Sequence, residues 1–200
     1  EGHTASIRAL AVLDAGHLAS GSEDETIRIW DRTTACCMAT LQGGGGFVYS
    51  LALLDTGLLA GGLHNGTIEV WDPSTALCTA KLTGHDDAVL SLVVLSGGRL
   101  VSASCDNRIR IWDLATARCV KTLSSHGDFH YALAVLGGGL LAIASANGIV
   151  ELWDPGSASC VTRLQKHLSC VTALAVMSAG CLASASFDKT VKVWSPAAAS

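Results

Sequence analysis

The five tryptophans of this chain are evenly spaced, at positions 30, 71, 112, 153 and 194, and the chain contains no others. Each follows the previous one by 41 residues. A fixed period of this length indicates one supersecondary unit repeated in tandem. Because a single unit of this size cannot bury its own apolar face, it must pack against its neighbours. The spacing therefore predicts an array of similar modules.

The composition is typical of a folded chain with a large core. Half of the 200 residues are hydrophobic and only 15% are charged, which argues against disorder. The formal net charge is −4, whereas sequence-independent nucleic-acid binding needs a basic surface. No run of lysine or arginine predicts contact with an anionic membrane. The repeat continues without a linker, so we interpret residues 1–200 as one domain.

The eight cysteines are interpreted as thiols. Four of them recur at the repeat period: Cys37, Cys78, Cys119 and Cys160. Equivalent positions in stacked modules lie too far apart for the short Cα–Cα distance of a disulfide. Buried thiols that behave as small apolar residues are typical of a reducing compartment. We therefore expect an intracellular protein, in the cytoplasm or nucleus.

Each unit contains short β-rich runs separated by Gly, Asn, Asp or Ser turns. In the first unit the runs are Ile7–Leu13, Leu18–Ser22, Thr26–Trp30 and a fourth centred on Cys37–Leu41. This pattern predicts antiparallel meanders. The units span approximately residues 1–42, 43–83, 84–124, 125–165 and 166–200.

The residues around the tryptophans resemble the WD40 repeat. A Gly-His pair precedes a Trp-Asp pair by a constant interval in two units, Gly2-His3 with Trp30-Asp31 and Gly84-His85 with Trp112-Asp113. Looser copies are Ser125-His126 with Trp153-Asp154 and Lys166-His167 with Trp194-Ser195, and the second unit has Gly44 at the histidine position. The resemblance covers essentially the whole chain. It implies an all-β fold, a β-propeller of four-stranded blades around a central channel.

The propeller is expected to be open or to be part of a larger one. WD40 propellers usually have seven blades, and this chain has five units. Only six residues follow Trp194, so the last unit lacks its fourth strand and nineteen strands are expected at most. Open edge strands would then allow self-association.

A histidine, a serine, an aspartate and the tryptophan recur together in three units. The sets are His3, Ser20, Asp24 and Trp30; His85, Ser102, Asp106 and Trp112; and His167, Ser184, Asp188 and Trp194. Ser, His and Asp also form hydrolase triads, but a nucleophile needs one exposed copy beside an oxyanion hole. The resemblance instead implies a structural hydrogen-bond network from Trp through Ser and His to Asp. We expect no catalytic residue, no metal and no cofactor.

Units two and four differ from the others in the same way. They share Phe-x-Tyr, Asn-Gly and a glutamate two residues before tryptophan: Phe47, Tyr49, Asn65-Gly66 and Glu69, then Phe129, Tyr131, Asn147-Gly148 and Glu151. Units one, three and five carry Arg28, Arg110 and Lys192 at the glutamate position. The 82-residue super-period indicates duplication of a blade pair. It predicts opposite charges on neighbouring blades, and weaker ties in units two and four, which lack the full network.

The resemblance also implies where a partner binds. In WD40 proteins, binding residues commonly lie on the narrow face, three and five residues after the histidine position and just before the aspartate position. Every phenylalanine and tyrosine of this chain falls at such a position, and large aromatic side chains suit a peptide hot spot. The predicted partner-binding residues are Arg8, Glu23, Phe47, Tyr49, His64, Leu90, Phe129, Tyr131 and Phe187. Packing of these rings between blades is the alternative.

The resemblance thus implies a non-catalytic scaffold that binds a peptide or protein segment. Two alternatives remain open: a structural subunit that packs laterally through its blade rims, and a substrate receptor in a larger assembly, such as a ubiquitin ligase or a signalling complex. The expected partner is a protein or peptide, and neither nucleic acid, a membrane nor a small-molecule substrate. An enzyme would need a carboxylate pair or metal cluster at the channel, and the sequence indicates neither.

Overall fold

The computed structural model describes residues 2–14, 16–124, 129–177 and 180–195. In this part of the chain it contains nineteen β-strands and one three-residue helical turn, η1 (Gly137–Gly139). The strands form five separate antiparallel sheets, four of them four-stranded and the last three-stranded. This confirms the predicted all-β architecture of five units with an incomplete fifth. No helix of the described residues has the length and apolar character needed to cross a membrane.

Each sheet is a meander of consecutive strands. The first blade contains β1 (Ile7–Val12), β2 (His17–Ser22), β3 (Thr26–Asp31) and β4 (Cys37–Gln42). The second contains β5 (Val48–Leu53), β6 (Leu59–Leu63), β7 (Ile68–Asp72) and β8 (Leu77–Leu82). The third contains β9 (Val89–Leu95), β10 (Arg99–Ser104), β11 (Ile109–Asp113) and β12 (Arg118–Leu123). The fourth contains β13 (His130–Val135), β14 (Leu141–Ser145), β15 (Ile149–Asp154) and β16 (Ser159–Gln165). The fifth contains β17 (Val171–Val176), β18 (Leu182–Ser186) and β19 (Val191–Trp194).

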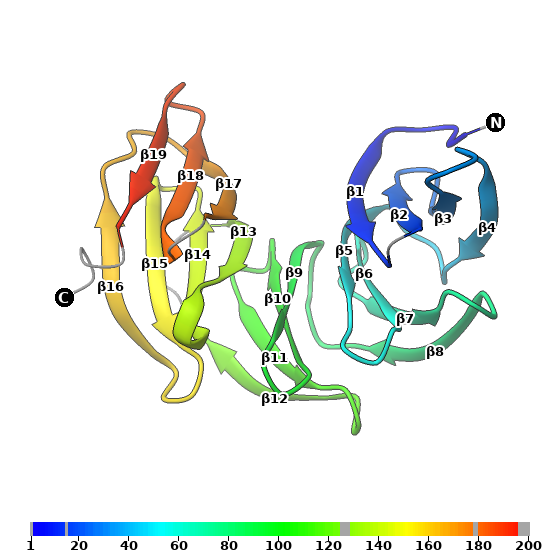
Figure 1. Cartoon of the computed structure of the whole chain (residues 1–200). Coiled ribbons are helices and arrows are strands. Elements are labelled where there is room, and N and C mark those ends of the chain that lie inside the picture. Colours follow the sequence, from blue (N-terminus) through cyan, green and yellow to red (C-terminus); the bar gives the residue numbers. More distant parts are fainter. Residues whose placement is uncertain (1, 15, 125–128, 178–179, 196–200) are drawn as a thin grey trace.

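The blades follow one another around an arc that is open between the first and the last (Figure 1). The first strands of successive blades, β1, β5, β9, β13 and β17, are neighbours on the inner side of the arc. The fourth strands β4, β8, β12 and β16 lie on its outer side. This arrangement is that of a partial propeller, in which each blade packs against the next one.

Because each blade is a meander, its two ends carry different loops. One end carries the turn between the second and third strands and the loop that leads into the first strand; we call it the mouth face. The other end carries the remaining two turns; we call it the opposite face. Strand β5 runs from one to the other, so residues just before Val48 lie at the mouth and residues just after Leu53 lie at the opposite face.

The core lies in the junctions between blades. Ile68 and Val70 of β7 pack with Val89, Leu92 and Trp112 of the third blade, and all five are buried. Because both faces of a central blade are covered in this way, its strands carry apolar residues on both sides.

The two terminal blades each leave one sheet face uncovered. Val191 and Val193 of β19 are 68% and 61% exposed, whereas the equivalent Val150 and Leu152 of the fourth blade are 0% and 5% exposed. At the other end, Ile7 is exposed while its equivalent Val48 is buried. Exposed apolar surface of this kind promotes association.

We expect the chain to self-associate with rising concentration through these open sheet faces. A Val191→Lys/Val193→Lys variant should then remain monomeric in sedimentation velocity at concentrations where the unmodified chain forms larger species. The matched control is Val120→Lys/Val161→Lys, because these two valines are exposed on the outer strands β12 and β16. Association that survives the β19 substitutions would instead assign it to the strand edges that the sequence indicated.

Candidate interaction site

The three Trp, Ser, His and Asp sets are each joined by hydrogen bonds. In the third blade Trp112 Nε1 donates to Ser102 Oγ at 2.8 Å, Ser102 Oγ lies 2.7 Å from His85 Nε2, and His85 Nδ1 lies 2.8 Å from Asp106 Oδ2. Since a carboxylate accepts only, Nδ1 carries the histidine proton and the serine hydroxyl donates to Nε2. The same bonds occur in the first and fifth blades at 2.6–2.9 Å.

This network is closed and lies beneath the surface. Ser102 and His85 are both buried. Burial lowers the pKa of His85, and this outweighs the opposing effect of Asp106. Burial alone would raise the pKa of Asp106, but the hydrogen bond from His85 and the backbone N–H groups of Asp86 and Arg108 hold that pKa below its ordinary value. A buried serine that already accepts from an indole N–H links neighbouring strands by hydrogen bonds and is not an accessible nucleophile.

The network predicts that acid destabilises the protein. Asp106 has a depressed pKa in the folded state, so its contribution is present above the unfolded-state pKa and is lost as the pH falls through the folded one. His85 also has a depressed pKa, so the unfolded chain gains its proton first and stability falls as the pH drops below about 6.5.

We expect Asp106→Asn to lower the urea midpoint at about pH 7 and to flatten its decline between about pH 5 and pH 3. Urea titrations followed by circular dichroism across this range measure both effects. Asp55→Asn, a change at an exposed carboxyl outside the network, serves as the control. Parallel pH curves for the wild type and Asp106→Asn would contradict the assigned role.

Glutamates replace this network in the second and fourth blades. Glu69 and Glu151 are each only 1% exposed. Glu69 Oε1 lies 2.7 Å from Lys81 Nζ and accepts from the Gly44 N–H at 3.0 Å. Glu151 accepts from Trp153 Nε1 at 2.9 Å and from Arg163 Nε at 2.9 Å.

The predicted alternation of charge between neighbouring blades does not lead to ion pairs between the glutamates and those blades. Each glutamate is paired across a hairpin of its own blade, Glu69 with Lys81 on β8 and Glu151 with Arg163 on β16. The two blades have a different buried polar anchor rather than a partial copy of the usual one. Gly43 makes room for it, since a Cβ there would lie 2.6 Å from Glu69 Oε2. His126, the expected histidine of the fourth unit, lies outside the described residues.

Five backbone hydrogen bonds bring the candidate partner-binding positions of each blade together at the mouth face. They run from Glu23 N–H to Ser6 O, His64 to Phe47, Cys105 to Ala88, Ala146 to Phe129 and Phe187 to Cys170, at 2.9–3.0 Å. In each blade, the residue before the Asp or Asn turn thus lies beside the loop that enters the first strand. Positions about 17 residues apart in the sequence become one surface patch per blade.

The second blade carries the densest of these patches. The ring centroid of Phe47 lies 6.3 Å from that of Tyr49 and 5.5 Å from that of His64, and the Tyr49 and His64 centroids lie 5.8 Å apart. Edge-to-face contacts such as the one between Phe47 and Tyr49 stabilise a pair of rings by about 0.5–1.5 kcal/mol beyond the area that they bury. We call Phe47, Tyr49 and His64 the aromatic cluster.

The fourth and fifth blades add further aromatic side chains. Phe129 is 44% exposed and Phe187 is 71% exposed. The pKa of Tyr131 is raised by burial first and then by the thiols of Cys170 and Cys105. Because these cysteines belong to the fifth and third blades, Tyr131 lies where three blades meet on the inner side of the arc.

The other predicted residues are placed as follows. Arg8 and Glu23 of the first blade pair with each other, with Arg8 Nε 2.7 Å from Glu23 Oε1. This ion pair lowers the pKa of Glu23. Leu90 is half-buried on β9, which lies between β5 and β13, and the Cys105 N–H of the same blade donates to Ala88 O. The third blade therefore contributes non-aromatic side chains between the aromatic groups of the second and fourth blades.

A comparison with protein families matches three of the five units. The profile of the family described as WD domain, G-beta repeat matches residues 1–31, 76–113 and 158–195, which together make up more than half of the chain. The chain belongs to the WD40 family. Each matched segment ends one residue after a tryptophan that donates to a serine. The two WD40 units that carry buried glutamates fall largely outside the matched segments.

Curated relatives share only a short segment with this WD40 chain. It is similar to the ribosome biogenesis protein BOP1 of Rattus norvegicus, with 49% identity over 45 residues, and to the ribosome biogenesis protein bop1 of Danio rerio, with 44% identity over 45 residues. Each alignment covers 22% of this chain and 6% of the relative. The likeness thus extends over little more than one WD40 unit.

Proposed function

We propose that this protein is a non-catalytic scaffold that binds a short segment of a partner protein at its mouth face. The observation that supports this best is the gathering of every phenylalanine and tyrosine at the mouth positions of three blades. Tyrosine and phenylalanine bury a large area with few rotamers to immobilise, and binding hot spots are rich in such rings. The Arg8–Glu23 pair supplies a polar rim.

The chemistry at the mouth supports binding rather than catalysis. The recurring serine and histidine are buried in closed networks. Among the described residues no group of three His, Cys, Asp or Glu side chains is placed to hold a metal ion. All eight cysteines are free thiols, which supports a reducing compartment, the cytoplasm or nucleus.

A second candidate function is lateral packing of the outer strands in a larger assembly. It is favoured by apolar side chains that are exposed on these strands at the repeat period, Met38 on β4, Val120 on β12 and Val161 on β16. Because two relatives are named ribosome biogenesis proteins, an extract that contains ribosome-assembly intermediates is the first place to look for a partner of either kind.

A pull-down with quantitative mass spectrometry separates the two candidates. We expect a Phe47→Ala/Tyr49→Ala/Phe129→Ala/Tyr131→Ala variant to lose a specific set of proteins that the wild type captures. The matched control is Met38→Thr/Val120→Thr/Val161→Thr, which changes the outer strands only. Circular dichroism first establishes that both variants are folded. Retention by the mouth variant with loss by the outer-strand variant would contradict binding at the mouth and assign it to the outer strands.

A further inference from the structure

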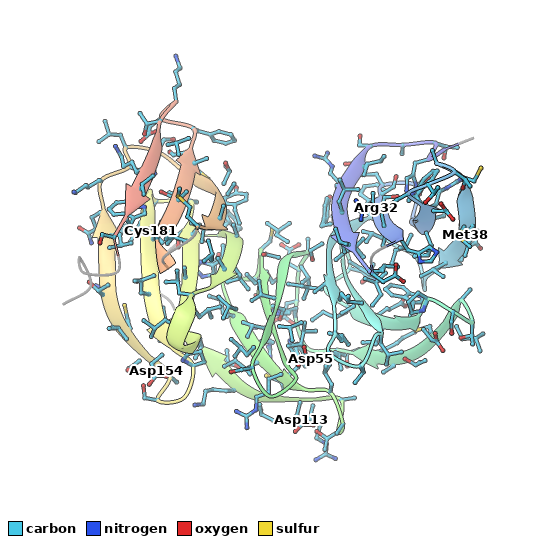
Figure 2. All side chains as sticks on the ribbon, in the orientation of Figure 1. Arg32, Met38, Asp55, Asp113, Asp154 and Cys181 are labelled. Atoms are coloured by element: carbon cyan, nitrogen blue, oxygen red, sulfur yellow. The ribbon has the colours of Figure 1, made fainter. Side chains whose placement is uncertain are left out.

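A cavity recurs at the opposite face where two blades meet. The one between the second and third blades has a volume of about 620 Å³ and is lined by Leu54, Asp55, Val70, Ala80 and Leu114 among others. The one between the first and second blades, of about 550 Å³, has residues at the equivalent repeat positions. Figure 2 shows Asp55 and Asp113 at the lower edge of the arc, where the second and third blades lie. These cavities lie at the far ends of the inner strands from the aromatic cluster.

At the junction between the third and fourth blades, a side chain of the protein itself reaches across to the next blade. Lys121 of β12 reaches across from the third blade to the fourth, where its Nζ lies 3.1 Å from Pro155 O and 2.6 Å from Gly156 O. Its ammonium group thus donates to two carbonyl oxygens of the next blade, and its aliphatic stem spans the distance between the blades. Ala39 and Ala80 occupy the equivalent positions of the first and second blades. The cavities at those two junctions, of about 620 and 550 Å³, are larger than the one of about 400 Å³ at the junction that Lys121 spans, because alanine fills less of this position than lysine does.

Acidic residues occur at the two junctions that lack this lysine and are absent at the equivalent position of the junction that has it. At the junction that Lys121 spans, the position equivalent to Asp55 is Ser96. At the first junction it is Asp14, whose Oδ2 lies 2.9 Å from His17 Nδ1. Asp55 is exposed and makes no hydrogen bond or ion pair with the described residues. Among the junctions that the structure describes, only the one between the second and third blades therefore has an unpaired carboxylate and no basic side chain at the repeat position of Ala80.

The other charged groups at this cavity leave a net negative charge. Asp113 accepts from the backbone N–H and hydroxyl of Thr116 at 2.9 and 3.0 Å. Arg99 also lines the cavity, and its charge helps to lower the pKa of Asp113. One arginine stands against two carboxylates, so the site is complementary to a cation.

We propose that the cavity between the second and third blades binds a lysine side chain of a partner polypeptide. The lysine stem would lie over Val70 and Ala80, and its ammonium group would donate to the carbonyl oxygens of Leu114 and Ala115, which are equivalent to those that Lys121 contacts. Asp55 would pair with the charge. A compact ammonium on a flexible stem fits this geometry, whereas a planar guanidinium favours bidentate partners. The site is independent of the aromatic cluster and does not rest on the function proposed for it.

An intramolecular version of the contact provides the first test. Ala80→Lys places at the second junction the side chain that Lys121 places at the third, so we expect the midpoint of thermal unfolding to rise by about 2–4 °C. Adding Asp55→Asn to this variant should remove a large part of that rise. Ala80→Met, which fills the cavity without a charge, and Ala39→Lys, which faces an aspartate already paired with His17, should both give smaller rises. An undiminished rise in the Ala80→Lys/Asp55→Asn double variant, or an equal rise for Ala80→Met, would overturn the proposed role of the charge.

Binding of a separate lysine is measured by NMR titration of the ¹⁵N-labelled chain. The probe is acetyl-Gly-Lys-Gly-amide, and the control peptide has norleucine, which keeps the stem and lacks the ammonium group. We expect the lysine peptide, and not the norleucine peptide, to shift the amide signals of Asp55, Leu114 and Ala115. The affinity should be several-fold weaker in Asp55→Asn, and Ala80→Lys should show no shifts. Equal shifts with the norleucine peptide, shifts confined to the mouth face, or no shifts in the wild type would each overturn the proposal.

Discussion

Replacing Trp112 by alanine is expected to lower the free energy of unfolding by about 3–5 kcal/mol, the usual cost of emptying a buried aromatic position. Trp112 is almost completely buried in the core between the second and third blades. Its loss also leaves Ser102 without the indole N–H that donates to it at 2.8 Å, and an unsatisfied buried group has its own cost. Equilibrium unfolding in urea, followed by circular dichroism, measures the change.

Two matched variants separate packing from hydrogen bonding. Trp30 is only half-buried, because the first blade has no neighbour on that side, so Trp30→Ala should be less than half as costly as Trp112→Ala. Trp71 Nε1 has no hydrogen-bond partner among the described residues, so Trp71→Phe should be milder than Trp112→Phe. Equal losses in either pair would contradict the position-specific roles that the structure assigns.

The second large effect is expected at a buried glutamate. Glu151→Ala should lower the free energy of unfolding by about 2–4 kcal/mol. The substitution leaves the indole N–H of Trp153 without its acceptor, removes the charge partner of Arg163 and creates a void. Arg163 is partly exposed and can be solvated, which keeps the cost below that of breaking a fully buried pair. Glu151→Gln retains acceptor and volume and should lose much less. A loss for Glu151→Ala below about 0.5 kcal/mol, as for an ordinary surface site, would show that this anchor is unimportant.

The repeat period made the architecture predictable from the sequence. Tryptophans at a constant interval, together with short apolar runs between turns, require a series of equal meanders. The three-stranded form of the last described sheet was likewise predictable, and the exposure of Val191 and Val193 is consistent with it. These features depend on local pattern and on packing between consecutive units, which a single sequence records directly.

The roles of the alternating residues were harder to predict because they depend on pairs across strands. Glu69 and Lys81 are directly opposite each other on neighbouring strands, and Glu151 and Arg163 repeat that relation. A fixed glutamate-to-cation interval in two units was the available signal. The pattern of residue types predicted only an alternation of charge between blades, whereas the fold buries both glutamates beside the tryptophan of the same blade.

The opposite-face cavity was missed for a similar reason. Its lining comes from two consecutive blades, so no single unit shows it. The signal was the series Ala39, Ala80, Lys121 and Thr162 at one repeat position. Only the structure shows that the lysine of this series crosses to the next blade, and that the alanines leave that position open.

The central claim, that the mouth face binds the partner, is tested most directly by site-specific photo-crosslinking. The photoreactive residue p-benzoylphenylalanine would replace Tyr131 at the mouth in one variant and Val120 on the outer strand β12 in another. Binding at the mouth predicts crosslinks to a partner protein from position 131 and none from position 120. Crosslinks from position 120 alone would contradict it and show that the partner binds the outer strands.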